Sequence, residues 1–238
     1  MQKLIWRNKL NLRFSFVRAA PSRSLLVVDE NQDLKFDGRA IELLNPQFNV
    51  VYIDSLEIER EINRLKGQSL SFSDYPLRTI VINEGLSEYD LSIIQGAMPE
   101  LVVFALVGVD RFAGSFTTSP TKFSRHNMTQ FELALNSDVL NDYPIEMKGG
   151  DSIEFYRQYL KNTERLDNPF CSSVTTQTEF DNSNFMIVHN FDNEKGQEGQ
   201  LTCKIKFVKP LTKKLILIFM PVSEKRIYFD NYFNVLKQ

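Results

Sequence analysis

Four short aliphatic runs in the first half of the chain constrain its fold more than any other feature. They lie at residues 25–28, 50–53, 79–82 and 101–107. A strand without polar alternation is typical of a sheet that is buried on both faces. Stretches with helical spacing of apolar residues lie between the runs, near 34–44, 56–65 and 89–94. This alternation predicts an α/β fold with a doubly wound, mostly parallel sheet of Rossmann or flavodoxin type.

The pattern changes after about residue 110, and a strand-rich α+β part is expected to follow. Residues 110–150 carry Gly and Ser/Thr clusters and one helix-like stretch at 128–135. A helix is expected from Asp151 or Ser152, its cap, with four apolar residues on one face: Ile153, Tyr156, Tyr159 and Leu160. Later strands are expected in an antiparallel meander at 185–189, 201–208, 214–220 and 226–229. The predicted organisation is a domain at 1–112, a linker or wrapping segment at 113–150 and a C-terminal part at 151–238.

Composition limits the classes of function. The net charge of −2 gives no global field for nucleic acid, so nucleic acid is an unfavoured partner. Two cysteines and two histidines cannot form a four-ligand zinc site within the chain. No apolar run reaches the length of about 18 residues that a membrane helix needs, so no membrane insertion is expected. The cysteine content favours a cytoplasmic protein, and nineteen Phe residues need a core or a partner surface.

Acidic residues follow three of the aliphatic runs. Asp29 and Glu30 end the first, Asp54 the second, and Glu84 the third. In an open parallel sheet such side chains meet at one edge, where ligands bind. Carboxylate oxygens are suitable ligands for Mg²⁺. The alternative is that these acids only mark strand ends and cap the following helices against their dipoles.

The stretch LLVVDEN (25–31), followed by DLKFDGRAIELL, resembles the opening of a response-regulator receiver domain. The resemblance covers residues 25–108 and implies a flavodoxin-like fold with magnesium held by Asp29 and Glu30. The family places its phosphoacceptor aspartate where this chain has Asn83, and its Ser or Thr where Gly108 follows Val107. An amide cannot accept a phosphoryl group, so the resemblance implies a degenerate receiver that is not phosphorylated.

Motifs for common cofactors and nucleophiles are missing from the sequence. Neither GxGxxG nor GxxxxGK[ST] occurs, and there is no GxSxG elbow. The residues after the first run, DENQD, lack glycine and would repel a pyrophosphate. These omissions favour a non-enzymatic protein without a cofactor, with Mg²⁺ as the alternative.

Aromatic residues near both ends suggest partner surfaces. Tyr228, Phe229, Tyr232 and Phe233 lie near the C-terminus and could close the core or contact a partner. At the N-terminus, basic residues interleave with aromatic ones and could bind single-stranded nucleic acid through Lys3, Arg7, Lys9 and Arg13. The same spacing also fits an edge strand protected by charges.

Three functions are therefore consistent with the sequence. The favoured one is a non-catalytic protein-interaction or assembly module, whose partner is another protein or a second copy. The first alternative is a Mg²⁺-dependent enzyme that acts on a phosphate ester through strand-end carboxylates. The second is nucleic-acid binding through the basic N-terminal strand.

Overall fold

A computed structural model describes residues 69–113, 119, 121–147, 152–163, 175–191, 194–229 and 235–236. Contacts group the chain into two units. The first includes β1 (Ser69–Asp74), the end of β10 (Leu215–Phe229) from Glu224 onward, and β11 (Val235–Leu236). Here β1 and β11 both pair with β10. The second unit holds the described residues of Tyr75–Ser223, and the predicted domain boundaries at 112 and 150 stay a prediction.

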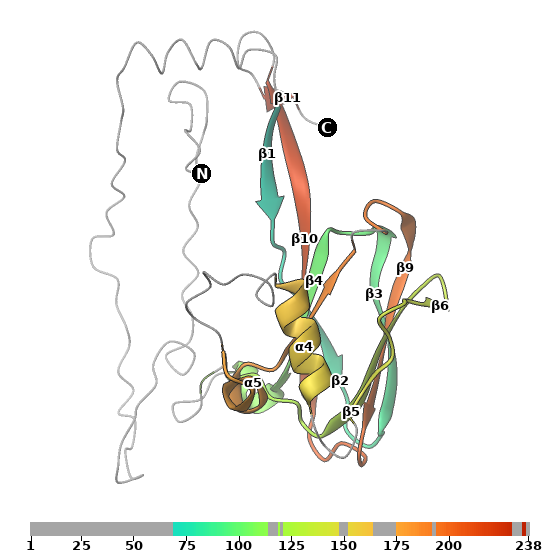
Figure 1. The fold of residues 1–238 in the computed structure, drawn as a ribbon, viewed down its shortest axis with the longest axis vertical. Coiled ribbons are helices and arrows are strands. Elements are labelled where there is room, and N and C mark those ends of the chain that lie inside the picture. Colours follow the sequence, from blue (N-terminus) through green and yellow to red (C-terminus); the bar gives the residue numbers. More distant parts are fainter. Residues whose placement is uncertain are drawn as a thin grey trace, which may run out of the picture. The chain divides into compact units, whose positions relative to one another are not determined.

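The second unit contains two antiparallel sheets (Figure 1). One is built from β2 (Arg78–Ile82), β10, β4 (Leu101–Gly108) and β8 (Met186–Asn190), in that order. The other runs from β3 (Glu88–Ala97) through β9 (Glu198–Phe207) to β5 (Met128–Leu135). The short strands β6 (Asp138–Val139) and β7 (Ile145–Glu146) also pair with β5.

This arrangement overturns the predicted doubly wound, Rossmann-like or receiver-like sheet. All pairings within the two sheets of the second unit are antiparallel, and the one parallel contact, between Phe123 and Asn184, is an isolated bridge among the described residues. The described part of the receiver-like stretch, from residue 69 to 108, contributes antiparallel strands to both sheets. The prediction was wrong because it took unbroken aliphatic runs as proof of parallel pairing.

The first sheet is apolar on both of its faces. Leu106 and Leu217 are register partners that point into the core between the sheets. Their neighbours Val107 and Ile216 are also partners, and alternation along a strand places them on the opposite face. Val107 is 0% exposed and Ile216 is 6% exposed, so this face is buried as well. An antiparallel strand buried on both faces has the same sequence pattern as a parallel one.

Two segments predicted as helices are strands. Residues 89–94 lie in β3, and residues 128–135 form β5. In β5 the alternating residues Phe131, Leu133 and Leu135 are all buried. Short apolar segments fit helical and strand spacing about equally well, and pairing with β9 decides the outcome in both cases.

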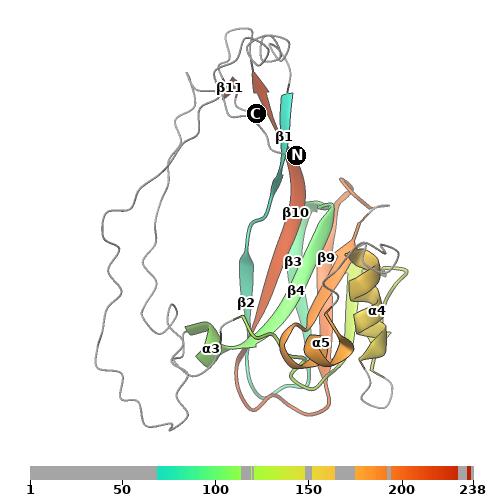
Figure 2. The same cartoon turned by 60° about the vertical axis from the view of Figure 1, so that its left-hand side comes forward.

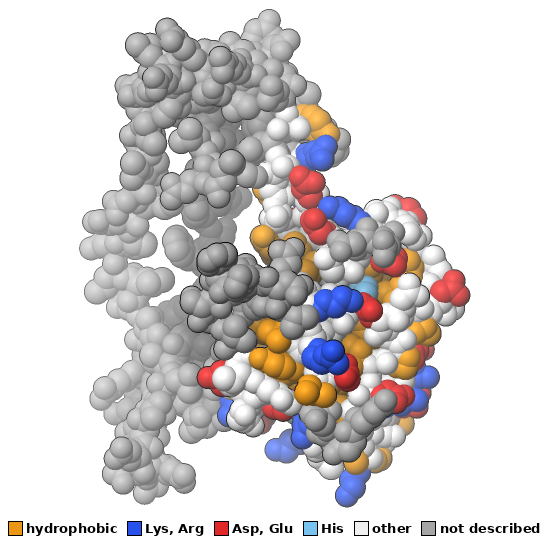
Figure 3. Space-filling model, in the orientation of Figure 1, with side chains coloured by type: hydrophobic (Ala, Val, Ile, Leu, Met, Phe, Trp, Pro, Cys, Tyr) orange, Lys and Arg blue, Asp and Glu red, His pale blue; other side chains and the backbone are white. Residues whose placement is uncertain are grey.

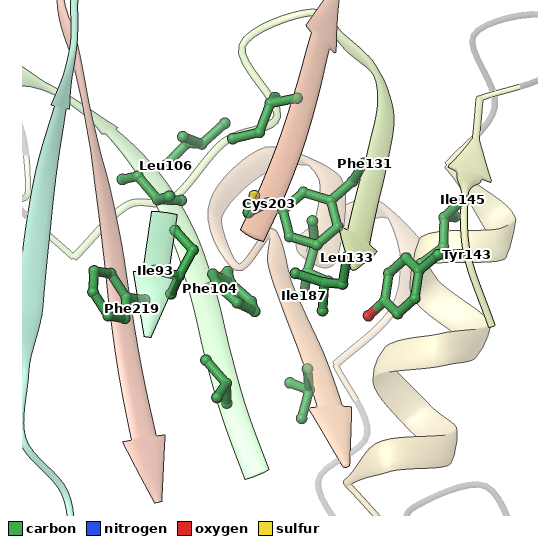
Figure 4. Packing of buried hydrophobic residues seen from close by; sticks show 14 of the residues in the cluster. Ile93, Phe104, Leu106, Phe131, Leu133, Tyr143, Ile145, Ile187, Cys203 and Phe219 are labelled. Carbon is green, nitrogen blue, oxygen red and sulfur yellow. The ribbon is translucent and has the colours of Figure 1, made fainter. Parts of the chain in front are cut away.

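Aromatic contacts join the two sheets into one core (Figure 4). The ring of Phe104 on β4 meets the ring of Phe131 on β5 edge to face, with 5.3 Å between centroids. Phe104 also stacks on Phe219 of β10 at 6.5 Å. Cys203 of β9 lies in the same core and is fully buried, as expected for a small core residue.

The predicted helix after residue 151 is confirmed as α4 (Ile153–Asn162). Phe155 and Tyr159 are its buried residues, whereas Ile153 of the predicted apolar face is 44% exposed. The Ser152 side chain makes no cap bond, because its hydroxyl donates to Asp181 on α5 (Gln177–Ser183). A further short helix, α3 (Val109–Ala113), follows β4 directly.

The later strands form as expected, but they do not form a meander. β8 and β10 belong to the first sheet, whereas β9, between them in sequence, belongs to the second (Figure 2). The predicted strands at 214–220 and 226–229 are parts of the single strand β10. Successive strands therefore cross between sheets, which sequence patterning alone does not reveal.

Candidate functional site

Among the described strands, β2 is the outermost strand at one side of the first sheet. Its residues pair with β10 on one side, from Ile82 opposite Leu215 to Arg78 opposite Phe219. Among the residues that the structure describes, none pairs with the other side of β2. An open edge presents unpaired N–H and C=O groups that can pair with another strand.

The other long edges of the two sheets are protected. At β8, the Asn162 side chain of α4 donates a hydrogen bond to the Val188 carbonyl, so the helix covers this edge. The edge strand β3 carries the exposed acids Glu88 and Asp90, and Glu88 forms an ion pair with Lys204 at 2.8 Å. Charges and covering helices are common devices against unwanted strand pairing.

Exposed apolar side chains accompany the open edge of β2. Val81 is 54% exposed, and Tyr75 and Leu77, just before the strand, are 58% and 63% exposed. Val81 continues a row of apolar residues across the sheet, since it pairs with Ile216, which pairs with Val107. We name Tyr75, Leu77 and Val81, together with the open side of β2, the β2 edge.

Sequence reasoning missed the β2 edge because it read 79–82 as a strand buried on both faces. Two signals in the sequence could have indicated an edge. Pro76 precedes the strand, and proline is confined to edges and strand beginnings within sheets. Arg78 places a charge directly before the aliphatic run 79–82, at the first position of β2, and the structure leaves it exposed.

The predicted partner-binding residues lie largely outside the described side chains. Tyr228 is half-buried on the part of β10 in the first unit. Phe229 ends that strand opposite Val235 of β11, while Tyr232 and Phe233 lie outside the described residues. The basic N-terminal residues Lys3, Arg7, Lys9 and Arg13 also lie outside them, so binding through either set stays a prediction.

The predicted magnesium ligands are represented by one residue. Glu84 is exposed in the turn after β2, whereas Asp29, Glu30 and Asp54 lie outside the described residues. Within the described ranges, no three His, Cys, Asp or Glu residues are grouped as a metal site would require. Within the described ranges the strands do not form the parallel sheet that was expected to bring the four acids together, and the magnesium site stays a prediction.

A buried polar group lies inside the core near α4. His189 is 5% exposed, and its ring meets Tyr143 at 5.2 Å and Phe191 at 4.4 Å. Neither nitrogen of His189, nor the Tyr143 hydroxyl, has a hydrogen-bond partner among the described residues. Burial lowers the pKa of His189 to about 4, and it raises the pKa of the Cys203 thiol well above its usual range. Both groups are therefore uncharged near neutral pH.

Comparison of the sequence with protein-family models and with curated proteins identifies no family for this chain. No protein-family model matches the chain, and no curated protein matches it. Among the described helices, none combines the length and apolar character needed to cross a membrane.

Proposed function

We propose that the protein is an assembly module that associates with a second copy of itself through the β2 edge. The observation that carries this proposal is an edge strand that is unpaired on its outer side within the described ranges and is flanked by exposed apolar side chains. Adding a strand to an exposed sheet edge is a recurrent mode of protein recognition, in which main-chain hydrogen bonds supply affinity.

The sequence of β2 suits pairing with its own copy. Around a twofold axis at Ile80, antiparallel strands would place Arg78 opposite Ile82 of the second copy, and Thr79 opposite Val81. Arg78 is the only charged residue of β2, so no like charges would face each other. Like charges directly opposite are destabilising, and β-branched pairs are favourable. An isologous dimer would thus join two first sheets into one continuous sheet.

The test is sedimentation over a range of protein concentrations, with Val81→Lys as the informative variant. We expect the parent to self-associate and Val81→Lys to remain monomeric, because the lysine would face Thr79 and the apolar row of the second copy. Val139→Lys is the matched control, since Val139 is 46% exposed on β6 of the second sheet. It should associate as the parent does.

Two outcomes would contradict the proposal. One is a parent protein that stays monomeric at high micromolar concentration. The other is association that Val81→Lys and Val139→Lys leave equally intact, because the contact would then lie elsewhere. Circular dichroism of each variant, compared with the parent, separates lost association from lost folding.

A further inference from the structure

A pocket of about 590 Å³ opens at the end of the second unit where β9 turns into β10. Three walls form it: the β4–α3 junction with Asp110 and Arg111, the turn before β5 with His126 and Asn127, and the connection from Val208 to Lys213. Its volume is within the range of about 300–1,000 Å³ that is typical of small-molecule sites. All its lining residues belong to the second unit.

Backbone hydrogen bonds hold the walls of this pocket in place. The Val208 N–H donates to the Asn127 carbonyl at 3.0 Å, which fixes one end of the β9–β10 connection. At the other end, Gly85 and Leu86 of the β2–β3 turn exchange hydrogen bonds with Leu211 at 2.9 and 3.0 Å. The Val109 N–H donates to the Lys214 carbonyl at 3.3 Å. The pocket is therefore preformed by the sheet framework.

The pocket lining carries more positive than negative charge. Arg111, Lys209 and Lys213 line it, and Asp110 is its one acid. None of the three cationic side chains forms an ion pair or hydrogen bond that the described residues account for. Figure 3 shows Lys and Arg side chains at the lower end of the described surface, where the β9–β10 turn lies in Figure 1.

Several cationic side chains elsewhere on the second unit form ion pairs with acids. Lys161 pairs with Asp142 at 3.3 Å, and Lys195 pairs with Glu100 at 2.9 Å. Lys204 pairs with Glu88 at 2.8 Å. The pocket instead gathers three cations that form no ion pair with a described acid, and a bound anion could neutralise them.

His126 contributes a titratable side chain to the pocket, and its backbone conformation is unusual. It and Asn127 have φ angles of 51° and 59°, a left-handed conformation that side-chain-bearing residues adopt uncommonly. The His126 Nε2 atom lies 3.1 Å from the Ser124 hydroxyl. Burial and, next, the positive charge of Arg111 lower the pKa of His126, whereas the nearby carboxylate of Asp110 opposes this shift. A bound anion would raise this pKa.

We infer that this pocket binds a small, multiply charged oxyanion, held by Arg111, Lys209 and Lys213 with His126 beside them. Arginine presents a planar fork that matches phosphate and carboxylate oxygens, and lysine supplies a mobile point charge. Phosphate and carboxylate ligands share this chemistry. The inference does not depend on self-association, because the β2 edge contributes no residue to the pocket.

Histidine NMR provides a direct test, because the chain contains only two histidines. The full chain is titrated with inorganic pyrophosphate in one arm and citrate in the other, against sodium chloride at matched ionic strength. We expect saturable shifts of the His126 resonances and an increased pKa of His126, with His189 unchanged. The ligand that binds more tightly identifies the source of the oxyanion.

Three lysine variants test which side chains hold the anion. Lys209→Gln and Lys213→Gln should each weaken the binding about tenfold, the usual effect of removing one charge-assisted contact. Lys195→Gln, at the β8–β9 turn and outside the pocket, should bind as the parent does. Shifts that sodium chloride reproduces, or affinities that Lys209→Gln and Lys213→Gln leave unchanged, would overturn the inference.

Discussion

At the residue scale, the burial of His189 makes the stability of the fold depend on pH. The folded-state pKa of His189, about 4, lies below its ordinary value of 6.5, chiefly because burial disfavours the charged ring. Asp142 raises this pKa and Lys161 lowers it, both to a smaller extent. A proton therefore binds the unfolded chain more tightly than the folded one, and protonation favours unfolding.

We predict that His189 makes folding less favourable as the pH falls from about 6.5 to about 4. Above pH 6.5 the ring is neutral in both the folded and the unfolded state. Below pH 4 the decrease in the free energy of unfolding levels off at roughly 3 kcal/mol. His189→Leu should lack this loss, so the two unfolding free energies should diverge within that window. Urea unfolding at several pH values measures it. Parallel profiles for parent and variant would contradict the assignment.

At the scale of the element, α5 shows how a short helix is fixed locally. The Thr176 hydroxyl accepts from the Glu179 N–H at 3.3 Å, and the Glu179 carboxylate accepts from the Thr176 N–H at 2.9 Å. These two bonds form a capping box. They orient Phe180, which is fully buried against Tyr159 and Phe185.

We predict that Thr176→Ala destabilises the protein by about 1 kcal/mol, the usual effect of losing a helix N-cap. Thr178→Ala is a matched control, since Thr178 lies exposed inside the same helix and should change stability little. Thermal and urea unfolding of both variants provide the measurement. Equal stabilities for the two variants would indicate that the cap does not support the packing of Phe180.

Several elements could be predicted from sequence because their patterns are local. The strands at 79–82 and 101–107 and the helix after 151 form as expected. Strand direction could not be predicted in this way. β4 and β10 are apolar on both faces, and this pattern is shared by parallel and doubly covered antiparallel sheets.

The candidate sites were harder to predict than the elements. The β2 edge depends on which strand lies outermost, and pairing across more than 100 residues, as between Ile82 and Leu215, decides this. The basic pocket likewise brings together Arg111, His126 and Lys209 from three connections. The spacing of residues along the sequence predicts neither the β2 edge nor the pocket. Both depend on which strands of the two sheets lie next to each other in space.

At the scale of the whole molecule, the described edges of the two sheets are unequally protected. A helix covers β8, and acids line β3, whereas β2 remains open among the described strands and carries exposed apolar residues. An edge strand presents unpaired N–H and C=O groups on which another chain can pair. A second copy of the chain would resolve this asymmetry by completing the first sheet.

Hydrogen exchange of the β2 amides at low and high protein concentration tests whether a second copy pairs with the β2 edge. We predict that the outward-facing amides of β2 exchange more slowly as protein concentration rises, because the second copy would pair with them. Amides of β3 should exchange at the same rate throughout. Exchange in β2 that is independent of concentration, or protection that develops along β3 instead, would contradict this prediction.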